Sequence, residues 1–396
     1  MKRIILHCDL DAFFCRAEEI KNPSLENEAF IVGGDGRRGI VSTCSYKARE
    51  YGIHSGMPTF QAKMLCPNIK IINSDFPFYQ LLSREFFHYL KKYSSKIEPM
   101  SIDECFVDLT DYFYKNKKDI KSILIEIQQG VFKDLNLKCS IGVGTTKFIA
   151  KMASDIHKPL GITIIRNKDI EKILFPLPVK NFFGVGRKTV PRLNQIGIYT
   201  IGDLYYKAKN NDPELINTLG KFSESICDLL EGNSDDQIDL SDNDPKSIGM
   251  SRTLDYDTNE ENIIIDILTK EVKSVCESLK REEKLAKTIT INYKDAASET
   301  HFKQTSFSKT FSSYTDNYEY ILKETLHLFK EHFNFEIIRL IGFSLKNFKN
   351  KNEVNTQLNL FNYQIQEKEN KTFVIINELN REMNKEAFKK LSDLKK

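Results

Sequence analysis

The chain has 396 residues, of which 40% are apolar and 29% charged, and its formal net charge is only +3. This length suggests two to four domains with enough chain for buried cores. No apolar run approaches the ~18 residues of a membrane-spanning helix, so we expect no membrane partner. With charges so balanced, a nucleic-acid partner would have to be bound by local patches and backbone amides.

The N-terminus and the cysteines indicate the compartment. The start, "MKRIILHCDLDAFF", has acids soon after its basic residues and no small-residue cleavage site, which predicts a first strand rather than a signal peptide. The eight cysteines form no Cys-x-x-Cys pair. This pattern is typical of reduced, mostly buried thiols in a cytoplasmic protein.

The first part of the chain predicts a ferredoxin-like order of strand, helix, strand, strand, helix, strand. The clearest helix has Leu82, Phe86, Leu90 and Tyr93 on one face. We assign this part to residues 1–21 and 75–166, interrupted by an insertion richer in glycine and basic residues. The expected elements are strands within residues 3–14, 104–110 and 138–144, a short strand before Asp103, and helices within residues 77–100 and 120–136.

The rest of the chain is expected to form a helical region, a linker, a second domain and a tail. The linker carries five aspartates and a proline in "NSDDQIDLSDNDPK" and is predicted to be exposed. The second domain repeats the chain order of strand, helix, strand, strand, helix, strand without visible sequence identity to the first. The expected ranges are 22–74 for the insertion, 167–232 for the helical region, 233–245 for the linker, 246–348 for the second domain and 349–396 for the tail.

Three carboxylates fall near strand ends. Asp9 ends the first strand, and Asp103 and Glu104 are adjacent in "PMSIDECFVDLT", between two strands. In a ferredoxin-like sheet that hairpin can lie beside the end of the first strand, so the acids can converge. Unpaired carboxylates at short range repel, so we expect a cation among them. Oxygen ligands favour Mg²⁺ or Mn²⁺ over zinc, although a "DE" pair alone is more often a solvated hairpin tip.

A second candidate group follows the glycine-rich loop "GGDGRRG". Tyr46 and Arg49 are three residues apart, so they share a face if this segment is helical. A guanidinium fork and a phenol hydroxyl suit a triphosphate. Taken alone, the same residues are more often ordinary surface groups on a helix.

Four segments in order, "DLDAFFCRAEE", "STCSYKAREYGIHSGMP", "SIDECFVDLT" and "KFIAKMASDIHKPLGI", resemble the successive motifs of the Y-family DNA polymerases, in particular their bacterial DNA polymerase IV branch. The similarity runs from the N-terminus to about Phe348. It implies an α+β multidomain fold: a ferredoxin-like palm with a fingers insertion, a helical thumb with a helix-hairpin-helix, and a second βαββαβ domain, the little finger.

The resemblance implies a template-directed, low-fidelity DNA polymerase that acts past lesions by two-metal phosphoryl transfer. We expect no proofreading exonuclease, since the chain length is already assigned. Two Mg²⁺ ions are implied, with Mn²⁺ as a substitute, and the chain is expected to be a monomer. Asp9, Asp103 and Glu104 would be the catalytic acids and, with the Leu10 carbonyl, the metal ligands. The implied nucleotide-binding residues are Phe13, Phe14 as the steric gate against ribose, Thr43, Tyr46, Arg49 and Lys158.

Contacts to primer-template DNA are expected in two places. "PVKNFFGVGRKTVPRLNQIGIYTIGDL" resembles a helix-hairpin-helix, and its Gly184 and Gly186 leave backbone N–H groups free for a phosphate. On the little finger, charge alone leaves a solvated sheet face nearly as plausible, and the resemblance favours a surface that follows phosphates. The basic residues expected there are Lys246, Arg252, Lys303 and Lys309.

The tail contains "QLNLF", which resembles the bacterial sliding-clamp binding motif. Its anchors would fill an apolar groove of the clamp; they are Gln357, Leu358, Leu360 and Phe361. Two other hypotheses stay open: a cyclase or other nucleotidyl transferase with a similar palm, and an inactive, clamp-recruited DNA-binding scaffold. The helix-hairpin-helix argues against the first, and the complete set of acids argues against the second.

Overall fold

The computed structural model describes residues 3–116, 118–234, 237–240, 244–296 and 303–351. The chain divides into two compact units, Met1–Asn243 and Asp244–Lys396. The expected clamp motif at 357–361 lies outside the described residues. Among the helices of the described part, none is long and apolar enough to cross a membrane.

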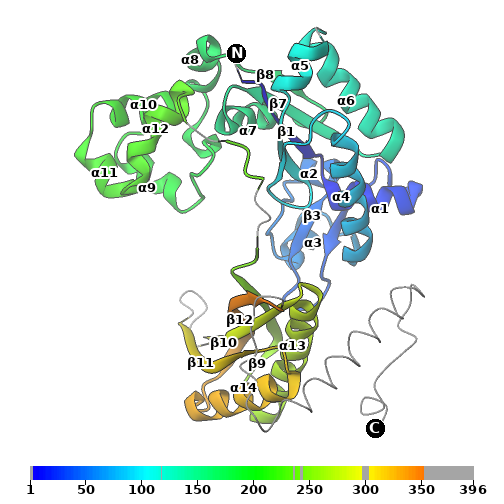
Figure 1. Cartoon of the computed structure of the whole chain (residues 1–396), viewed down its shortest axis with the longest axis vertical. Coiled ribbons are helices and arrows are strands. Elements are labelled where there is room, and N and C mark those ends of the chain that lie inside the picture. Colours follow the sequence, from blue (N-terminus) through cyan, green and yellow to red (C-terminus); the bar gives the residue numbers. More distant parts are fainter. Residues whose placement is uncertain (1–2, 117, 235–236, 241–243, 297–302, 352–396) are drawn as a thin grey trace. The chain divides into compact units, whose positions relative to one another are not determined.

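A five-stranded sheet forms the centre of the first unit, in the order β5-β6-β1-β7-β8. Figure 1 labels three of its strands, β1, β7 and β8. Its first four strands have the predicted ferredoxin-like arrangement, with β1 antiparallel to both β6 and β7. The fifth strand, β8, pairs in parallel with β7 and was not predicted. The strands are β1 (Ile5–Leu10), β5 (Ile97–Pro99), β6 (Glu104–Asp108), β7 (Cys139–Gly144) and β8 (Ile162–Ile164).

Side chains of β1 alternate between two faces, as a half-buried strand requires. Leu6, Cys8 and Leu10 pack into a core with residues of α4 and α6. Ile5 packs on the other face against Ala150 of α7, and Asp9 shares that side of the strand by its spacing. The helices around this sheet are α1 (Phe13–Lys21), α4 (Phe76–Leu90), α5 (Thr110–Asn116), α6 (Ile120–Leu135) and α7 (Lys147–Ile156).

The position of α7 follows from the sequence at both ends. Thr146 caps its first turn by accepting a hydrogen bond from the Ile149 amide. At the other end, Pro159 disfavours helical geometry at Lys158, so the helix stops at Ile156. Between these ends the helix packs against β7 at Gly142, where an added Cβ would lie 2.1 Å from the Ala150 carbonyl oxygen. Glycine is therefore needed for this close approach.

The insertion folds as a small three-stranded sheet in the order β3-β2-β4, with its own core around Ile31, Val41 and Ile53. Tyr46 and Arg49 do lie on one short helix, α2, whose N-cap is Ser45. The elements of the insertion are η1 (Pro23–Leu25), β2 (Phe30–Gly33), β3 (Val41–Cys44), α2 (Tyr46–Glu50), α3 (Thr59–Leu65) and β4 (Lys70–Ile72).

A helical region follows, and its core includes apolar side chains of α7, such as Phe148 and Met152. Gly184 sits in the turn between η3 and α9 at φ 103°, a conformation that favours glycine. The elements are η2 (Asn167–Asp169), α8 (Ile170–Leu174), η3 (Val179–Asn181), α9 (Thr189–Gln195), α10 (Ile201–Lys209), α11 (Pro213–Leu219) and α12 (Phe222–Glu231).

The second unit has the predicted chain order, but its sheet is arranged differently from the first. The strand order is β11-β10-β12-β9, so the first strand, β9, lies at an edge and pairs only with β12 within the sheet, whereas β1 of the first unit lies between β6 and β7. The last strand also extends to Asn350, two residues beyond the expected domain end, because Asn350 pairs with Lys284. The elements are β9 (Ser247–Thr258), α13 (Glu261–Arg281), β10 (Lys284–Asp295), β11 (Gln304–Thr315), α14 (Tyr318–His332) and β12 (Ile338–Asn350).

Candidate active site

Sheet register brings two of the three predicted acids, Asp9 and Glu104, together, and Asp103 precedes Glu104 in the chain. Asp9 of β1 lies opposite Glu104 of β6, and the Leu10 amide donates a 2.9 Å hydrogen bond to the Asp103 carbonyl oxygen. Asp9 and Glu104 are therefore cross-strand neighbours, and Asp103 occupies the turn that leads into β6. All three are only partly exposed.

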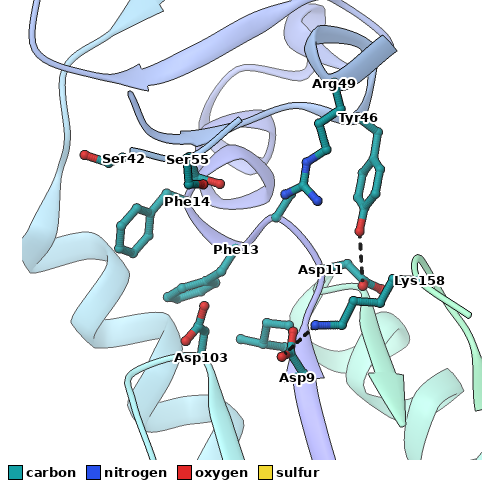
Figure 2. A pocket seen from close by; sticks show the side chains of 13 residues that line it. Asp9, Asp11, Phe13, Phe14, Ser42, Tyr46, Arg49, Ser55, Asp103 and Lys158 are labelled. Atoms are coloured by element: carbon teal, nitrogen blue, oxygen red, sulfur yellow. Dashed lines mark hydrogen bonds and ion pairs between the residues drawn. The ribbon is translucent and has the colours of Figure 1, made fainter. Parts of the chain in front are cut away.

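A cavity of about 280 Å³ opens beside these acids (Figure 2). Asp9 and Asp103 line it, whereas Glu104 lies outside the lining. The lining also contains every nucleotide-binding residue that the sequence predicts. The cavity residues are Asp9, Leu10, Asp11, Ala12, Phe13, Phe14, Ser42, Thr43, Tyr46, Arg49, Ser55, Asp103 and Lys158.

The polar end of the cavity is fixed by ion pairs and stacking. Lys158 Nζ lies 2.8 Å from Asp9 Oδ2. The Arg49 guanidinium lies over the Tyr46 ring, 4.6 Å from its centroid, and the Tyr46 hydroxyl donates a 3.3 Å hydrogen bond to Asp11 Oδ1. Figure 2 shows the side chains of Arg49, Tyr46 and Lys158 on one side of the cavity. Two cations and a phenol hydroxyl thus meet where an anion could bind.

Asp11 was missed by the sequence reasoning, although it lies two residues beyond Asp9. Its side chain is 3% exposed and accepts hydrogen bonds from the Ser140 hydroxyl and the Leu160 amide, both at 2.8 Å. Burial raises its pKa against the effect of these donors. Asp11 therefore connects β1, the loop that carries Lys158, and the Tyr46 hydroxyl of the insertion.

Two aromatic rings form the apolar side of the cavity. Phe13 is buried, and the half-buried Phe14 stacks on Tyr79 with ring centroids 4.5 Å apart. The Tyr79 hydroxyl in turn donates a 2.6 Å hydrogen bond to the buried Glu18. Because Tyr79 is held both at its ring and at its hydroxyl, it fixes the Phe14 ring in one orientation toward the cavity.

The acids differ in charge environment. Burial raises the pKa of Asp103, and the nearby charges of Asp9 and Glu104 raise it further. The pKa of Glu104 is held below its usual range, first by its contact with the buried His7 ring and then by the Lys151 ammonium. His7 and Lys151 were also missed. His7 lies two residues before Asp9 on the same strand, so period-two spacing could have indicated it.

The donor set fits a hard divalent cation. His7, Asp9 and Glu104 each offer a ligand atom, and these atoms lie within 4.8 Å of one another. The Lys151 ammonium already lies 2.7 Å from Glu104 Oε2 and 3.3 Å from Asp9 Oδ2, so this position favours positive charge. Carboxylate oxygens dominate the cluster, as in sites for Mg²⁺ and Mn²⁺.

None of the residues predicted to contact DNA is among those that line this cavity. Gly184 and Gly186 are exposed in one turn whose Phe182 and Val185 point into the core of the helical region. On the second unit, two predicted cations are already ion-paired: Arg252 lies 3.1 Å from Glu271, and Lys309 2.7 Å from Glu324. Lys246 and Lys303 are exposed.

Known proteins resemble this chain over most of its length. The impB/mucB/samB family model matches residues 8–155, the IMS family HHH motif matches 167–198, and the family's C-terminal domain matches 245–360. The chain is 38% identical to DNA polymerase IV of Oceanobacillus iheyensis over 382 residues, which are 95% of this chain and 88% of that protein.

Solved structures show the same architecture. A Y-family DNA polymerase chimera, Dbh-Dpo4(243-245)-Dbh, matches with a TM-score of 0.76 and 24% identity, over 88% of this chain and 99% of that one. An insertion ternary complex of Dbh DNA polymerase matches with a TM-score of 0.60 and 25% identity, over 88% and 99%. The predicted fold class is confirmed, and the chain belongs to the impB/mucB/samB family, in the DNA polymerase IV branch of the Y-family DNA polymerases.

Proposed function

We propose that the cavity binds the incoming deoxynucleoside triphosphate of template-directed DNA synthesis past lesions, with primer-template DNA as the second substrate. The observation that supports this most directly is the lining itself. Asp9 and Asp103 stand at one end, Arg49 and Lys158 supply positive charge, and Phe14 forms an apolar wall. Membership of the DNA polymerase IV branch makes DNA synthesis the reaction to which these residues belong.

The acids would hold two Mg²⁺ ions, or Mn²⁺ in their place. Asp9, Asp103, Glu104 and the Leu10 carbonyl would be ligands, and Glu104, the catalytic glutamate, would bind the ion nearest the primer end. When bound, two such ions stabilise the attacking and leaving oxygens of a phosphoryl transfer. Phosphoryl transfer needs little covalent chemistry from the protein, so positioning and charge neutralisation carry the catalysis.

The remaining residues would orient the nucleotide. The Lys158 ammonium and the Arg49 guanidinium would neutralise the triphosphate, and the Tyr46 hydroxyl would donate a hydrogen bond to it. Phe14 would occupy the space of a ribose 2′-oxygen and accept deoxyribose, with Phe13 beside it under the sugar. Thr43 lines the same cavity from β3 and would add a hydroxyl contact.

The parts of the fold then take the roles of a Y-family polymerase. The five-stranded sheet would be the palm, the insertion the fingers, and the helical region the thumb. In the thumb, the exposed turn with Gly184 and Gly186 would contact a backbone phosphate, which carries no sequence information. The second unit would be the little finger. Lys246 and Lys303 would contact DNA phosphates, whereas Arg252 and Lys309 also form ion pairs with Glu271 and Glu324.

The test is primer extension by the purified protein with single dNTPs on templates that differ in one base. We expect insertion of the complementary nucleotide, release of diphosphate, and loss of insertion in excess EDTA with recovery in Mg²⁺. Insertion without regard to the template base would contradict template direction. Cyclisation of a nucleoside triphosphate without DNA would favour the cyclase hypothesis instead.

A further inference from the structure

One buried cation, Lys151, lies beside the acids without lining the cavity. Lys151 lies in the middle of α7, on the helix face that packs over β1 and β6, and its side chain is 10% exposed. Its Nζ is 2.7 Å from Glu104 Oε2 and 3.3 Å from Asp9 Oδ2. A buried ammonium between two proposed metal ligands is costly to desolvate, so its placement needs an explanation.

The backbone holds this ammonium in place. Because Gly142 lets α7 approach β7 closely, the helix that carries Lys151 has little freedom to move away from the sheet. Asp155, one helical turn further on, lies 3.6 Å from Lys151 Nζ. The Lys151 ammonium is therefore surrounded by three carboxylates, those of Asp9, Glu104 and Asp155.

The neighbouring Lys158 differs in its setting. Its Nζ lies 2.8 Å from Asp9 Oδ2, but it lines the cavity and follows the end of α7 in a loop (Figure 2). It can turn toward a bound triphosphate without disturbing a helix. Lys151 does not line the cavity, so contact with the nucleotide does not explain it.

We propose that Lys151 is a resident counter-ion of the metal site. Its ammonium pairs with Asp9 and Glu104 and keeps the two carboxylates aligned when no metal is bound, and a divalent ion must compete with it for these carboxylates. This inference rests on the proposed function, because it takes the acids to be metal ligands. In this proposal Lys151 is a positioning residue with two effects. It keeps the carboxylates ordered in the metal-free protein, and it lowers the affinity of the site for a divalent ion.

Removal of the Lys151 charge is expected to destabilise the metal-free protein and to strengthen the binding of a divalent ion. Without Lys151, Asp9 and Glu104 repel each other in the metal-free state and attract a divalent ion more strongly. Even with the screening of bulk water, an ammonium about 4 Å from a divalent ion opposes the binding of that ion by at least about tenfold in affinity. A purely structural ion pair would leave metal affinity unchanged.

The experiment compares Lys151→Gln, which removes the charge but keeps a hydrogen-bond donor, with Lys151→Arg, which keeps the charge. The matched control is Lys147→Gln on the same helix, since Lys147 pairs with Glu98 at 2.9 Å and not with the metal acids. Mn²⁺ binding to the full chain is measured from the electron paramagnetic resonance signal of free Mn²⁺. Melting temperatures are measured in EDTA and in saturating Mg²⁺.

We expect Lys151→Gln to bind Mn²⁺ at least about tenfold more tightly and to melt below the parent in EDTA, with most of that loss recovered in Mg²⁺. Lys151→Arg and Lys147→Gln should keep the parent's affinity. The counter-ion proposal is wrong if Lys151→Gln binds no more tightly, or if Lys151→Arg tightens binding equally. A parent that binds Mn²⁺ no better than Asp9→Asn would instead refute the proposed metal site itself.

Discussion

Asp9 and Glu104 face each other across the β1–β6 ladder, in a register that the core fixes. Their neighbours Cys8 and Cys105 are also paired and are fully buried on the other face of the sheet. A slip of one residue would bury the carboxylates and expose the thiols, at a large cost in free energy. The same packing that stabilises the palm therefore places two of the three acids.

The Phe14→Ala variant tests the steric gate. Removing the ring removes a clash with one hydroxyl group, so ribonucleotide insertion should rise at least about tenfold, the equivalent of ~1.4 kcal/mol. Deoxyribonucleotide insertion should change much less. The measurement is single-nucleotide insertion with rNTP and dNTP, and Phe132→Ala, a change at an exposed ring on α6, is the control. Unchanged selectivity in Phe14→Ala would reject the gate.

Gly142→Ala should destabilise the first unit. The added Cβ would lie 2.1 Å from the Ala150 carbonyl oxygen and 2.2 Å from the Ser154 amide nitrogen, so α7 must shift. Overpacking of this kind costs on the order of 1–3 kcal/mol. Gly186→Ala, where a Cβ meets nothing within 4 Å, should have little effect on stability. Urea unfolding of both variants measures the difference, and equal midpoints would contradict the close approach.

The cysteines should react very unevenly in the native protein. Cys8 and Cys105 are fully buried, and their thiol pKa values are raised well above the usual range: by the Cys139 contact and burial for Cys8, and by burial for Cys105. The thiolate that reacts is therefore scarce at neutral pH. Iodoacetamide labelling followed by mass spectrometry should modify the half-buried Cys66 first, and Cys8 and Cys105 only in denaturant. Early labelling of Cys8 would show that the core opens.

Replacing Leu360 and Phe361 with Ala tests recruitment through "QLNLF". Tethering to a clamp that encircles DNA raises the local concentration at the primer end, to about the mM range for a short flexible linker. The double variant should lose stimulation by a sliding clamp and keep clamp-free extension on a short primer. A normal response to the clamp would exclude this docking peptide, and loss of clamp-free activity would make the segment structural.

Sequence patterns predicted the longer elements well. The helices Ile120–Leu135 and Glu261–Arg281 each present several turns of apolar spacing, which a window of the sequence can detect. Strands of three or four residues, such as Ile162–Ile164 in the palm and Phe30–Gly33 in the insertion, are too short for such a signal. The sequence likewise does not predict the order of the strands in the sheet of the second unit, because the same chain order of strands and helices is compatible with several sheet arrangements.

The site was predicted in part. Asp9, Asp103 and Tyr46 were chosen from motifs, and the structure places them on one cavity, while their catalytic roles stay predictions. Asp11 and Lys151 were missed because their importance depends on tertiary contacts: Asp11 with the loop after α7, and Lys151 with β1 and β6. Spacing within one element cannot reveal partners that another element supplies.

The most direct test of the account is single-turnover insertion of one dNTP by Asp103→Asn. The control is Asp111→Asn, which makes the same change at a residue whose ion-pair partner among the described residues is Lys96, at 2.9 Å. We predict that Asp103→Asn lowers the insertion rate by roughly 10²-fold or more, the scale of losing one electrostatic contact to a transition state, while Asp111→Asn keeps the parent's rate and both variants still bind primer-template DNA. Insertion by Asp103→Asn at the parent's rate would contradict the assignment of this cavity as the polymerase active site.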